Sequence, residues 1–463
     1  MDDLLRDRRS SAGRAIGVLA LAGWLAAVSA LPARADGLSL AEAVKRALAD
    51  GRASRISRLH AERGQEAVGE LQGAYLPQLS VSSSAGYSNR SNEKLRAVDA
   101  QGREKVYGLS SLGSDRGWFN VYVDQILFDL RRWRTLEREE LAAEAARVQE
   151  SRDRDQVAYD VTRQFAALVR MQRDAERGLQ ALEDARGLDR EAASLLASGR
   201  LLAVERERAA LHLEQAELEA RERAAAIDEA RAALWSAMGG APGGDGGLVL
   251  AAESLPTPSE PPGAVSEQEV AEAPELRVLE LREKMEQKTV AAANARRYPT
   301  LGLRAGYSNY GPHRFDQYGD EAQIGIDLEL PIFDGFQTAH AVAEATKDAE
   351  IARLQYRSLL QQKQRRVNEL RRLLEAADAK LSLAERRARA AGEERRIADL
   401  NLHAQRGRLM DALAAREHAA REAEAAGDAW LGRIDLWAQL QLERGRLAAA
   451  ILGEAARPSA PAP

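Results

Sequence analysis

Cysteine is missing from all 463 residues of the chain. Its absence excludes a disulfide scaffold, a thiolate metal site and a cysteine nucleophile. Long hydrophobic runs are also missing after residue 35, where no stretch approaches the ~20 apolar residues that a transmembrane helix needs. The net charge of −5 has the opposite sign to that of most nucleic-acid binders, and no basic stripe is present. We therefore predict no nucleic-acid partner.

Catalytic and metal-binding motifs are missing as well. The chain has no nucleophile elbow, no His-Glu-x-x-His pair and no framework with paired carboxylates. Its six histidines are scattered along the chain, and a lone histidine on a helix surface is usually solvated. The sequence therefore predicts a protein that is not an enzyme and that has no cofactor and no metal site.

The first 35 residues have the pattern of a secretory signal peptide. Four arginines precede an apolar run over residues 15–31, and Ala33-Arg34-Ala35 forms a small-residue cleavage site. Asp36 is then the first mature residue, and the mature chain has a charge near −7. A membrane-anchor helix is the alternative, which the short run and the adjacent cleavage site disfavour.

The remaining chain is rich in the residues of long helices. Charged residues make up 30% of it, and alanine, glutamate, arginine and leucine dominate. Residues 130–197 and 336–404 contain no proline and almost no glycine, so each segment predicts a helix roughly 100 Å long. Apolar residues in them recur every three or four positions, which is typical of coiled coils. Return helices are expected over 201–238 and 409–452. Helices alone would also fit an ordinary coiled-coil rod.

The sequence contains an internal repeat of roughly 200 residues. Four landmarks recur in the same order, and the clearest is Ala85-Gly86-Tyr87-Ser88-Asn89, which returns as Ala305-Gly306-Tyr307-Ser308-Asn309. The predicted organisation is a signal peptide (1–35), a first repeat (36–240), a Gly/Pro-rich linker (241–274), a second repeat (275–452) and a disordered tail (453–463).

Four segments alternate between apolar and polar residues, as strands do. Their apolar positions are Leu79, Val81, Ala85 and Tyr87; Phe119, Val121 and Val123; Leu301, Leu303, Ala305 and Tyr307; and Ile324, Ile326, Leu328 and Leu330. Each segment is close to the ~9–11 residues of a tilted transmembrane strand. The polar segments 90–116 and 311–320 are expected to be loops at the strand ends.

Alternation alone fits a half-buried soluble sheet about equally well. Two features favour a barrel strand. The polar face includes Arg304, Asp327 and Glu329, which suit a wet lumen, and each strand pair is followed by helices too long for a compact domain. Four strands cannot close a barrel, and an open edge in lipid leaves backbone groups unpaired. A membrane-spanning sheet of this kind must therefore be completed by other chains.

Taken together, these residues resemble the TolC family of outer-membrane factors. The resemblance extends from Leu38 to about Leu452, and its most specific parts are the duplicated order of elements, the segment 330–335 and the glycine turn before residues 409–413. It implies a mainly helical fold with four transmembrane strands per protomer. It also implies a homotrimer with a twelve-stranded barrel in the outer membrane of a Gram-negative cell and a helical tunnel through the periplasm.

The resemblance further implies a passive exit duct. Such a channel serves a tripartite efflux or type I secretion system and docks a periplasmic adaptor that connects it to an inner-membrane transporter. Drugs, metal ions and polypeptides all use ducts of this type, and the pump chooses among them. The runner-up interpretation is a periplasmic coiled-coil scaffold without a pore, which would fractionate as a soluble rod.

Two turns match the adaptor-docking tips of the family. They are Gly199-Arg200-Leu201 and Gly407-Arg408-Leu409. A glycine can adopt positive φ and reverse the chain, and an exposed leucine beside it would offer an apolar anchor. The alternative is a plain hairpin turn without a partner.

A periplasmic gate is expected next to these turns, because the family narrows its lumen there with acidic rings. Asp411 matches one ring position, whereas the second expected acid is replaced by Ala414. Glu205 is a further gate candidate beside the first tip. The sequence also departs from the family after the first helix, where Asp50-Gly51-Arg52 stands at a place that often holds Asn-Pro.

Overall fold

A computed structural model describes residues 37–87, 94–98, 101–108, 115–241, 250–251, 255, 270–311, 320–404 and 406–453. The predicted signal peptide and almost all of the predicted linker and tail lie outside these residues. Among the described helices, none is both long enough and apolar enough to span a membrane.

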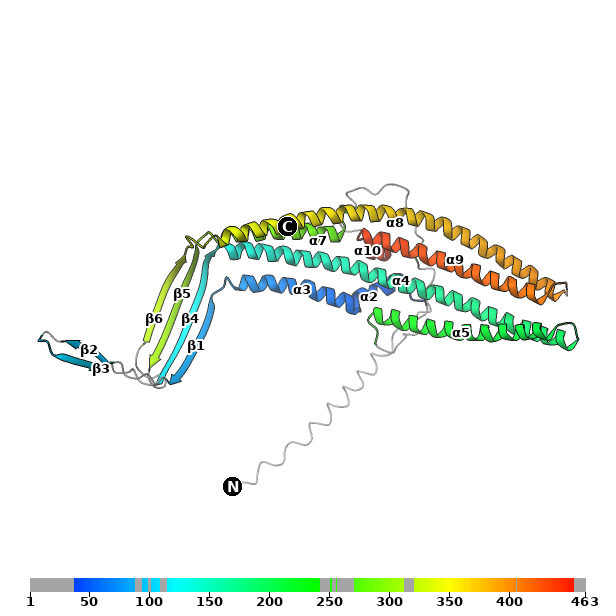
Figure 1. The fold of residues 1–463 in the computed structure, drawn as a ribbon, viewed down its shortest axis with the longest axis horizontal. Helices are drawn as coiled ribbons and strands as arrows, with labels where there is room; N and C mark the ends of the chain where they lie inside the picture. Colours follow the sequence, from blue (N-terminus) through cyan, green and yellow to red (C-terminus); the bar gives the residue numbers. More distant parts are fainter. Residues whose placement is uncertain are drawn as a thin grey trace, which may run out of the picture.

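The described residues form a mainly helical molecule with a sheet at one end (Figure 1). In chain order the elements are α2 (Leu40–Asp50), α3 (Arg52–Gly73), β1 (Gln78–Tyr87), β2 (Lys94–Val98), β3 (Glu104–Gly108), β4 (Asp115–Asp129), α4 (Leu130–Ala197), α5 (Ala203–Ala237), α7 (Pro274–Ala295), β5 (Thr300–Gly311), β6 (Asp320–Glu329), α8 (Gln337–His403), α9 (Leu409–Glu443) and α10 (Leu447–Leu452). The predicted fold class, long helices combined with a small sheet, is confirmed.

The four predicted strands form one antiparallel sheet in the order β1-β4-β5-β6. Its register places the predicted apolar positions in common rows, for example Leu79 opposite Val123, Val123 opposite Ala305, and Ala305 opposite Ile324. Because side chains alternate along a strand, the polar positions share the other face. There the Arg304 guanidinium donates to the Asp124 carboxylate over 2.6 Å.

No helical layer covers this sheet among the described elements (Figure 1). Every residue of the edge strand β6 is exposed, including Ile324, Ile326 and Leu328 on the apolar face. A soluble sheet normally buries one face against another layer. The protomer therefore has an apolar sheet face that it does not cover itself.

The polar segment expected to be a loop contains secondary structure. Strands β2 and β3 pair antiparallel, with Lys94 opposite Gly108 and Val98 opposite Glu104, and the hairpin extends beyond the end of the main sheet (Figure 1). The turn between them contains Gly102 with φ of +76°. The expectation of an irregular loop was wrong here, because the mixed charges of this short hairpin hide its strand pattern.

Aspartates begin both long helices where the strands end. The Asp129 carboxylate accepts from the Arg132 backbone N–H over 3.0 Å and caps α4. The Asp334 carboxylate accepts from the Thr338 backbone N–H over 2.9 Å in the first turn of α8. These contacts satisfy backbone donors that have no partner within the helix.

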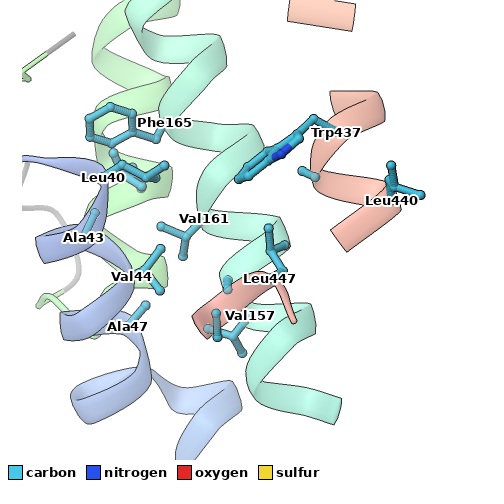
Figure 2. Packing of buried hydrophobic residues seen from close by; sticks show 14 of the residues in the cluster. Leu40, Ala43, Val44, Ala47, Val157, Val161, Phe165, Trp437, Leu440 and Leu447 are labelled. Carbon is cyan, nitrogen blue, oxygen red and sulfur yellow. The ribbon is translucent and has the colours of Figure 1, made fainter. Parts of the chain in front are cut away.

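The main hydrophobic core lies around the middle of α4, where α2, α9 and α10 pack against it (Figure 2). Leu40 of α2 lies against Phe165 of α4, and Val44 points toward Val161 (Figure 2). All four side chains are almost fully buried. At Asp50-Gly51-Arg52 the chain turns, since α2 ends at Asp50 and α3 begins at Arg52.

A buried lysine holds the helices together beside this core. Lys363 of α8 is buried, and its ammonium pairs with Glu275 at the start of α7 over 2.5 Å and with Glu443 at the end of α9 over 2.7 Å. A buried charge requires such partners because desolvation is costly. The cluster therefore fixes the ends of two helices against the long helix α8.

The last predicted helix, over 409–452, is interrupted. Helix α9 ends at Glu443, Gly445 adopts φ of +66°, and the short helix α10 follows. The Ala448 backbone N–H donates to the buried carboxylate of Asp155 in α4 over 2.8 Å. The chain thus reverses to bury α10 in the main core, which a repeat of apolar positions alone does not reveal.

Candidate functional site

The ends of the four long helices meet far from the sheet (Figure 1). A small second core joins them, with buried residues from every one of these helices: Leu188 and Ala192 of α4, Ala209 of α5, Leu402 of α8, and Leu409, Ala412 and Leu413 of α9. Leu201 and Met410 pack at its margin. The structure therefore brings the two predicted docking turns together at one tip of the molecule.

The first turn depends on the backbone of Gly199. Its φ is +70°, and the Arg200 backbone N–H donates to the Leu195 carbonyl over 2.9 Å. Residues with a Cβ are strained in this left-handed region. The proposed reason for a glycine is therefore confirmed at this position.

The second turn uses its glycine differently. Gly407 does not have a positive φ, and its backbone N–H and that of Arg406 both donate to the Asn401 carbonyl, over 3.0 and 2.8 Å. A Cβ on Gly407 would lie 3.1 Å from the Asn401 Cβ and 3.2 Å from the Leu402 nitrogen. Close approach of two chain segments, and not a left-handed backbone, is what favours glycine here.

The leucines of the two motifs are not exposed anchors within the protomer. Leu409 is only 3% exposed in the tip core, and Leu201 is partly buried against the same core. The exposed apolar residues of the first tip are instead Leu202, at 70%, and Val204, at 64%. The expected exposure of the motif leucines is not found, because two consecutive leucines after a turn do not reveal which one faces inward, and the docking role of both turns stays a prediction.

Asp411 lies in the first turn of α9 with an exposed side chain. Ala414, the replaced acidic position, is also exposed. An exposed carboxylate at a helix N-terminus is favoured by the helix dipole whether or not it lines a pore. The gate role of Asp411 therefore stays a prediction.

Glu205, the other gate candidate, has a local structural contact. Its carboxylate accepts from the Leu202 backbone N–H over 3.3 Å at the start of α5. This contact satisfies a backbone donor at the helix N-terminus, as the acidic member of a capping box does. This helix cap is by itself a sufficient reason for an acidic residue at position 205, and the gate role of Glu205 stays a prediction.

Ion pairs that the sequence did not indicate connect the helices just above the tip. Arg206 of α5 pairs with Asp189 of α4 over 2.7 Å. Arg416 of α9 pairs with Asp399 of α8 over 2.9 Å and donates to the Asp184 carbonyl of α4 over 3.0 Å. The partners lie up to 232 positions apart, so sequence spacing could not have paired them.

Metal-binding geometry is absent from the described part of the chain, where no three histidine or acidic side chains gather in a way that could hold an ion.

The tip offers two turns, the exposed apolar side chains of Leu202 and Val204, and exposed charges. Its arrangement is suited to contact with another protein.

Comparison with known sequences identifies a family over part of the chain. Residues 265–404 match the sequence model of the outer membrane efflux proteins. This match spans α7, β5, β6 and α8, the elements from the second strand pair to the end of the second long helix. No curated protein matches the chain closely enough to count as a relative.

Solved structures with the same fold extend over most of the chain. CusC superimposes with a TM-score of 0.70 at 15% identity, covering 88% of this chain and 92% of CusC. VceC of Vibrio cholerae gives a TM-score of 0.68 at 18% identity, covering 88% of this chain and 96% of VceC. The CmeC outer membrane channel of Campylobacter jejuni gives 0.69 at 16%, with coverage of 88% and 85%. At these identities the likeness establishes the fold.

Proposed function

We propose that the chain is an outer membrane efflux protein of the TolC family, located in the outer membrane, and that three copies of it form a passive exit duct. The family-model match over residues 265–404 and the fold shared with CusC and VceC support this proposal. In this duct the sheets close into one barrel, and the long helices continue it as a tunnel into the periplasm. A periplasmic adaptor docks at the helical tips and connects the duct to an inner-membrane transporter of an efflux or type I secretion system. Members of the family are channels, and no enzymatic step is part of this proposal.

The observation that carries the proposal is the uncovered sheet. Its register gathers the apolar side chains on one face, and its two edge strands, β1 and β6, are free to pair with other copies. Lipid is the surrounding that suits such an apolar face, and closure with neighbouring copies satisfies the edges.

The helices supply the tunnel. Helices α4 and α8 have 68 and 67 residues, so each is roughly 100 Å long. Both begin next to the sheet (Figure 1), so in the proposed duct their whole length lies on one side of the membrane.

Reconstitution tests the proposal against a scaffold without a pore. The purified mature chain is expected to run as a heat-resistant trimer from the outer-membrane fraction and to conduct ions in planar bilayers. A monomeric, soluble rod without conductance would overturn the duct and leave the scaffold.

Leu202 and Val204 are the proposed apolar contacts of the adaptor at the first tip. Large apolar side chains that are exposed together at a protein tip commonly mark an interface. Leu202→Asp is expected to abolish efflux while the trimer and its conductance persist. Leu218→Asp, on the same helix with an equally apolar and 55% exposed side chain, serves as the control and should leave docking unchanged.

Asp411 is the proposed gate residue. In a trimer, three copies of this exposed carboxylate next to the tunnel end would favour cations over anions. Single-channel recording on Asp411→Ala is expected to show reduced cation selectivity and weaker block by divalent cations. If both properties are unchanged, Asp411 has no part in the gate. Glu205→Gln, which weakens only the helix cap, is expected to leave selectivity as it is.

A further inference from the structure

A cavity of about 590 Å³ lies directly beneath the sheet, where four helices end or begin. Its walls come from the last turn of α3, the first turn of α4, the last turns of α7 and the beginning of α8. The proposed tips are at the opposite end of these long helices (Figure 1). The cavity is therefore separate from the docking and gating site.

The cavity opens on the concave side of the helical wall. The helices stand side by side in the order α3, α4, α7, α8, because neighbours in this order contact each other. The two outer helices of this wall, α3 and α8, both line the same cavity. The wall must therefore curve so that the cavity lies on its concave side. When copies complete a cylinder, the concave side faces the lumen, so this step rests on the proposed function.

The end of the cavity nearest the sheet is basic. Arg131, Arg132 and Arg296 line it. Arg132 pairs with Asp129 over 3.2 Å, whereas Arg131 and Arg296 have no acidic partner within the described part of the chain. Arg131 and Arg132 also stand in the first turn of α4, where the helix dipole adds positive charge.

A tyrosine adds an unused hydrogen-bond donor to this basic end. The Tyr75 hydroxyl is buried and has no hydrogen-bond partner among the described residues. Burial raises the pKa of Tyr75 above its usual value, and the nearby carboxylate of Asp129 acts in the same direction. Tyr75 therefore keeps its proton and can donate to an anion that enters the cavity, for which arginine is the usual second partner.

The other end of the cavity is acidic. Glu344 and Asp348 of α8 line it one helical turn apart, and neither has a basic partner within the described residues. Two like charges at this spacing repel each other unless a cation lies between them. Small apolar side chains form the wall between the two ends: Ala74, Ala292, Ala293, Ala341 and Ala345.

We infer that this cavity is a binding station in the lumen for dipolar solutes that carry an anionic group and an amine on an apolar stem. The anionic group pairs with Arg131 and Arg296 and accepts from Tyr75. The ammonium group pairs with Glu344 and Asp348, and the stem lies over the alanine wall. A trimer presents three such stations between the tunnel and the barrel.

A matched set of three probes tests the inference on the mature trimer in detergent. The probes are 6-aminohexanoate, which carries both charges, hexanoate, which carries only the anion, and hexylamine, which carries only the cation. Calorimetric titration is expected to give binding of 6-aminohexanoate about tenfold tighter than that of either singly charged probe, since one charged hydrogen-bonded contact contributes about that factor. Equal affinity for all three probes would overturn the inference.

Paired variants assign each end of the solute to its end of the cavity. The double variant Arg131→Gln/Arg296→Gln should reduce the affinity for 6-aminohexanoate to that for hexylamine and leave hexylamine unchanged. The double variant Glu344→Gln/Asp348→Asn should do the converse with hexanoate. Arg297→Gln, an exposed neighbour outside the cavity lining, is the matched control. Unchanged 6-aminohexanoate affinity in both double variants contradicts the assignment.

Conductance measured on the same preparations separates this inference from the proposed function. A trimer that conducts but prefers none of the probes overturns the binding station alone. A protein that prefers 6-aminohexanoate but never conducts overturns the duct, and the cavity is then a binding site on a different kind of assembly.

Discussion

The two ends of this molecule differ in how far a single chain completes them. At the sheet end, β6 is exposed along its whole length and carries uncovered apolar residues. At the tip end, side chains from four helices close a small core in which Leu409 is only 3% exposed. One end thus depends on surroundings that the protomer lacks, and the other packs by itself.

The difference teaches how to interpret exposed apolar residues in such a chain. In β6 they form a continuous face whose register is fixed by pairing with β5, and in the proposed duct this face meets lipid. At the tip they are two side chains, Leu202 and Val204, beside a closed core, and the proposed function assigns them to contact with the adaptor. Under the proposed function, the face on β6 serves assembly and the pair at the tip serves docking.

The largest expected effect comes from placing a charge on the apolar sheet face. Ile326→Arg should prevent assembly in the membrane, because an arginine facing lipid near the bilayer centre costs about 2–4 kcal/mol in each strand. The measurement is the yield of heat-resistant trimer in the outer-membrane fraction.

Gln323→Arg is the control for this change, because it adds the same side chain to the other face of the same exposed strand. It should preserve the trimer. If both variants assemble equally well, the two faces of the sheet are equivalent and the apolar face does not meet lipid.

Next in size is the removal of tip core packing. Leu409→Ala should lower the free energy of opening at the tip by about 2–4 kcal/mol, because the cavity it leaves is enclosed by other buried residues. Leu202→Ala should change it by less than about 0.5 kcal/mol, because this side chain is already exposed. Hydrogen exchange at the backbone amides of residues 410–413 measures the difference. Equal effects would mean that the tip core forms only in the assembled trimer.

A buried carboxylate makes the stability of the main hydrophobic core around α4 depend on pH. Asp155 is 4% exposed, and burial raises its pKa from 3.8 to about 6, partly opposed by the Ala448 N–H that it accepts. Between these two values the folded chain binds more protons at Asp155 than the unfolded chain does, so the contribution of this group to stability is fully present below pH 4 and is lost as the pH rises through 6. The loss amounts to about 2–3 kcal/mol.

Asp155→Asn should remove this pH dependence, since the amide oxygen can still accept from Ala448 without a charge. The variant is expected to melt at a higher temperature than the parent near pH 7.5 and at a similar temperature near pH 4. A parent and variant that melt with the same pH profile would assign the pH dependence to other groups.

Much of this fold could be predicted because its signals are long. A segment without proline and with one apolar stripe predicted a helix over 130–197, and α4 has those bounds. Strand alternation predicted the four strands of the sheet, and their apolar positions do share one face. A pattern that repeats over many residues still predicts the element correctly when a few positions deviate, whereas a short pattern does not.

Several missed features depend on short local motifs or on contacts between distant residues. Helix α9 ends just before Gly445, whose φ is +66°, and α10, which follows it, donates through the Ala448 N–H to the distant Asp155. Leu201 packs inward while Leu202 does not, although the two are the same residue type. The candidate docking turns could be located from the sequence, but their exposed side chains could not.

The smallest expected effect separates the two glycines of the tip, whose sequence motif is the same. Gly199 has φ of +70°, so Gly199→Ala should destabilise the first turn by about 1 kcal/mol, and Gly199→Asn should cost less because asparagine tolerates this region. Gly407 lacks a positive φ but faces Asn401 and Leu402 closely, so asparagine there should be no better tolerated than alanine. Hydrogen exchange at the two turns compares the four variants. If asparagine is better tolerated than alanine at both positions, the two turns share one backbone geometry, and the difference in φ between Gly199 and Gly407 is contradicted.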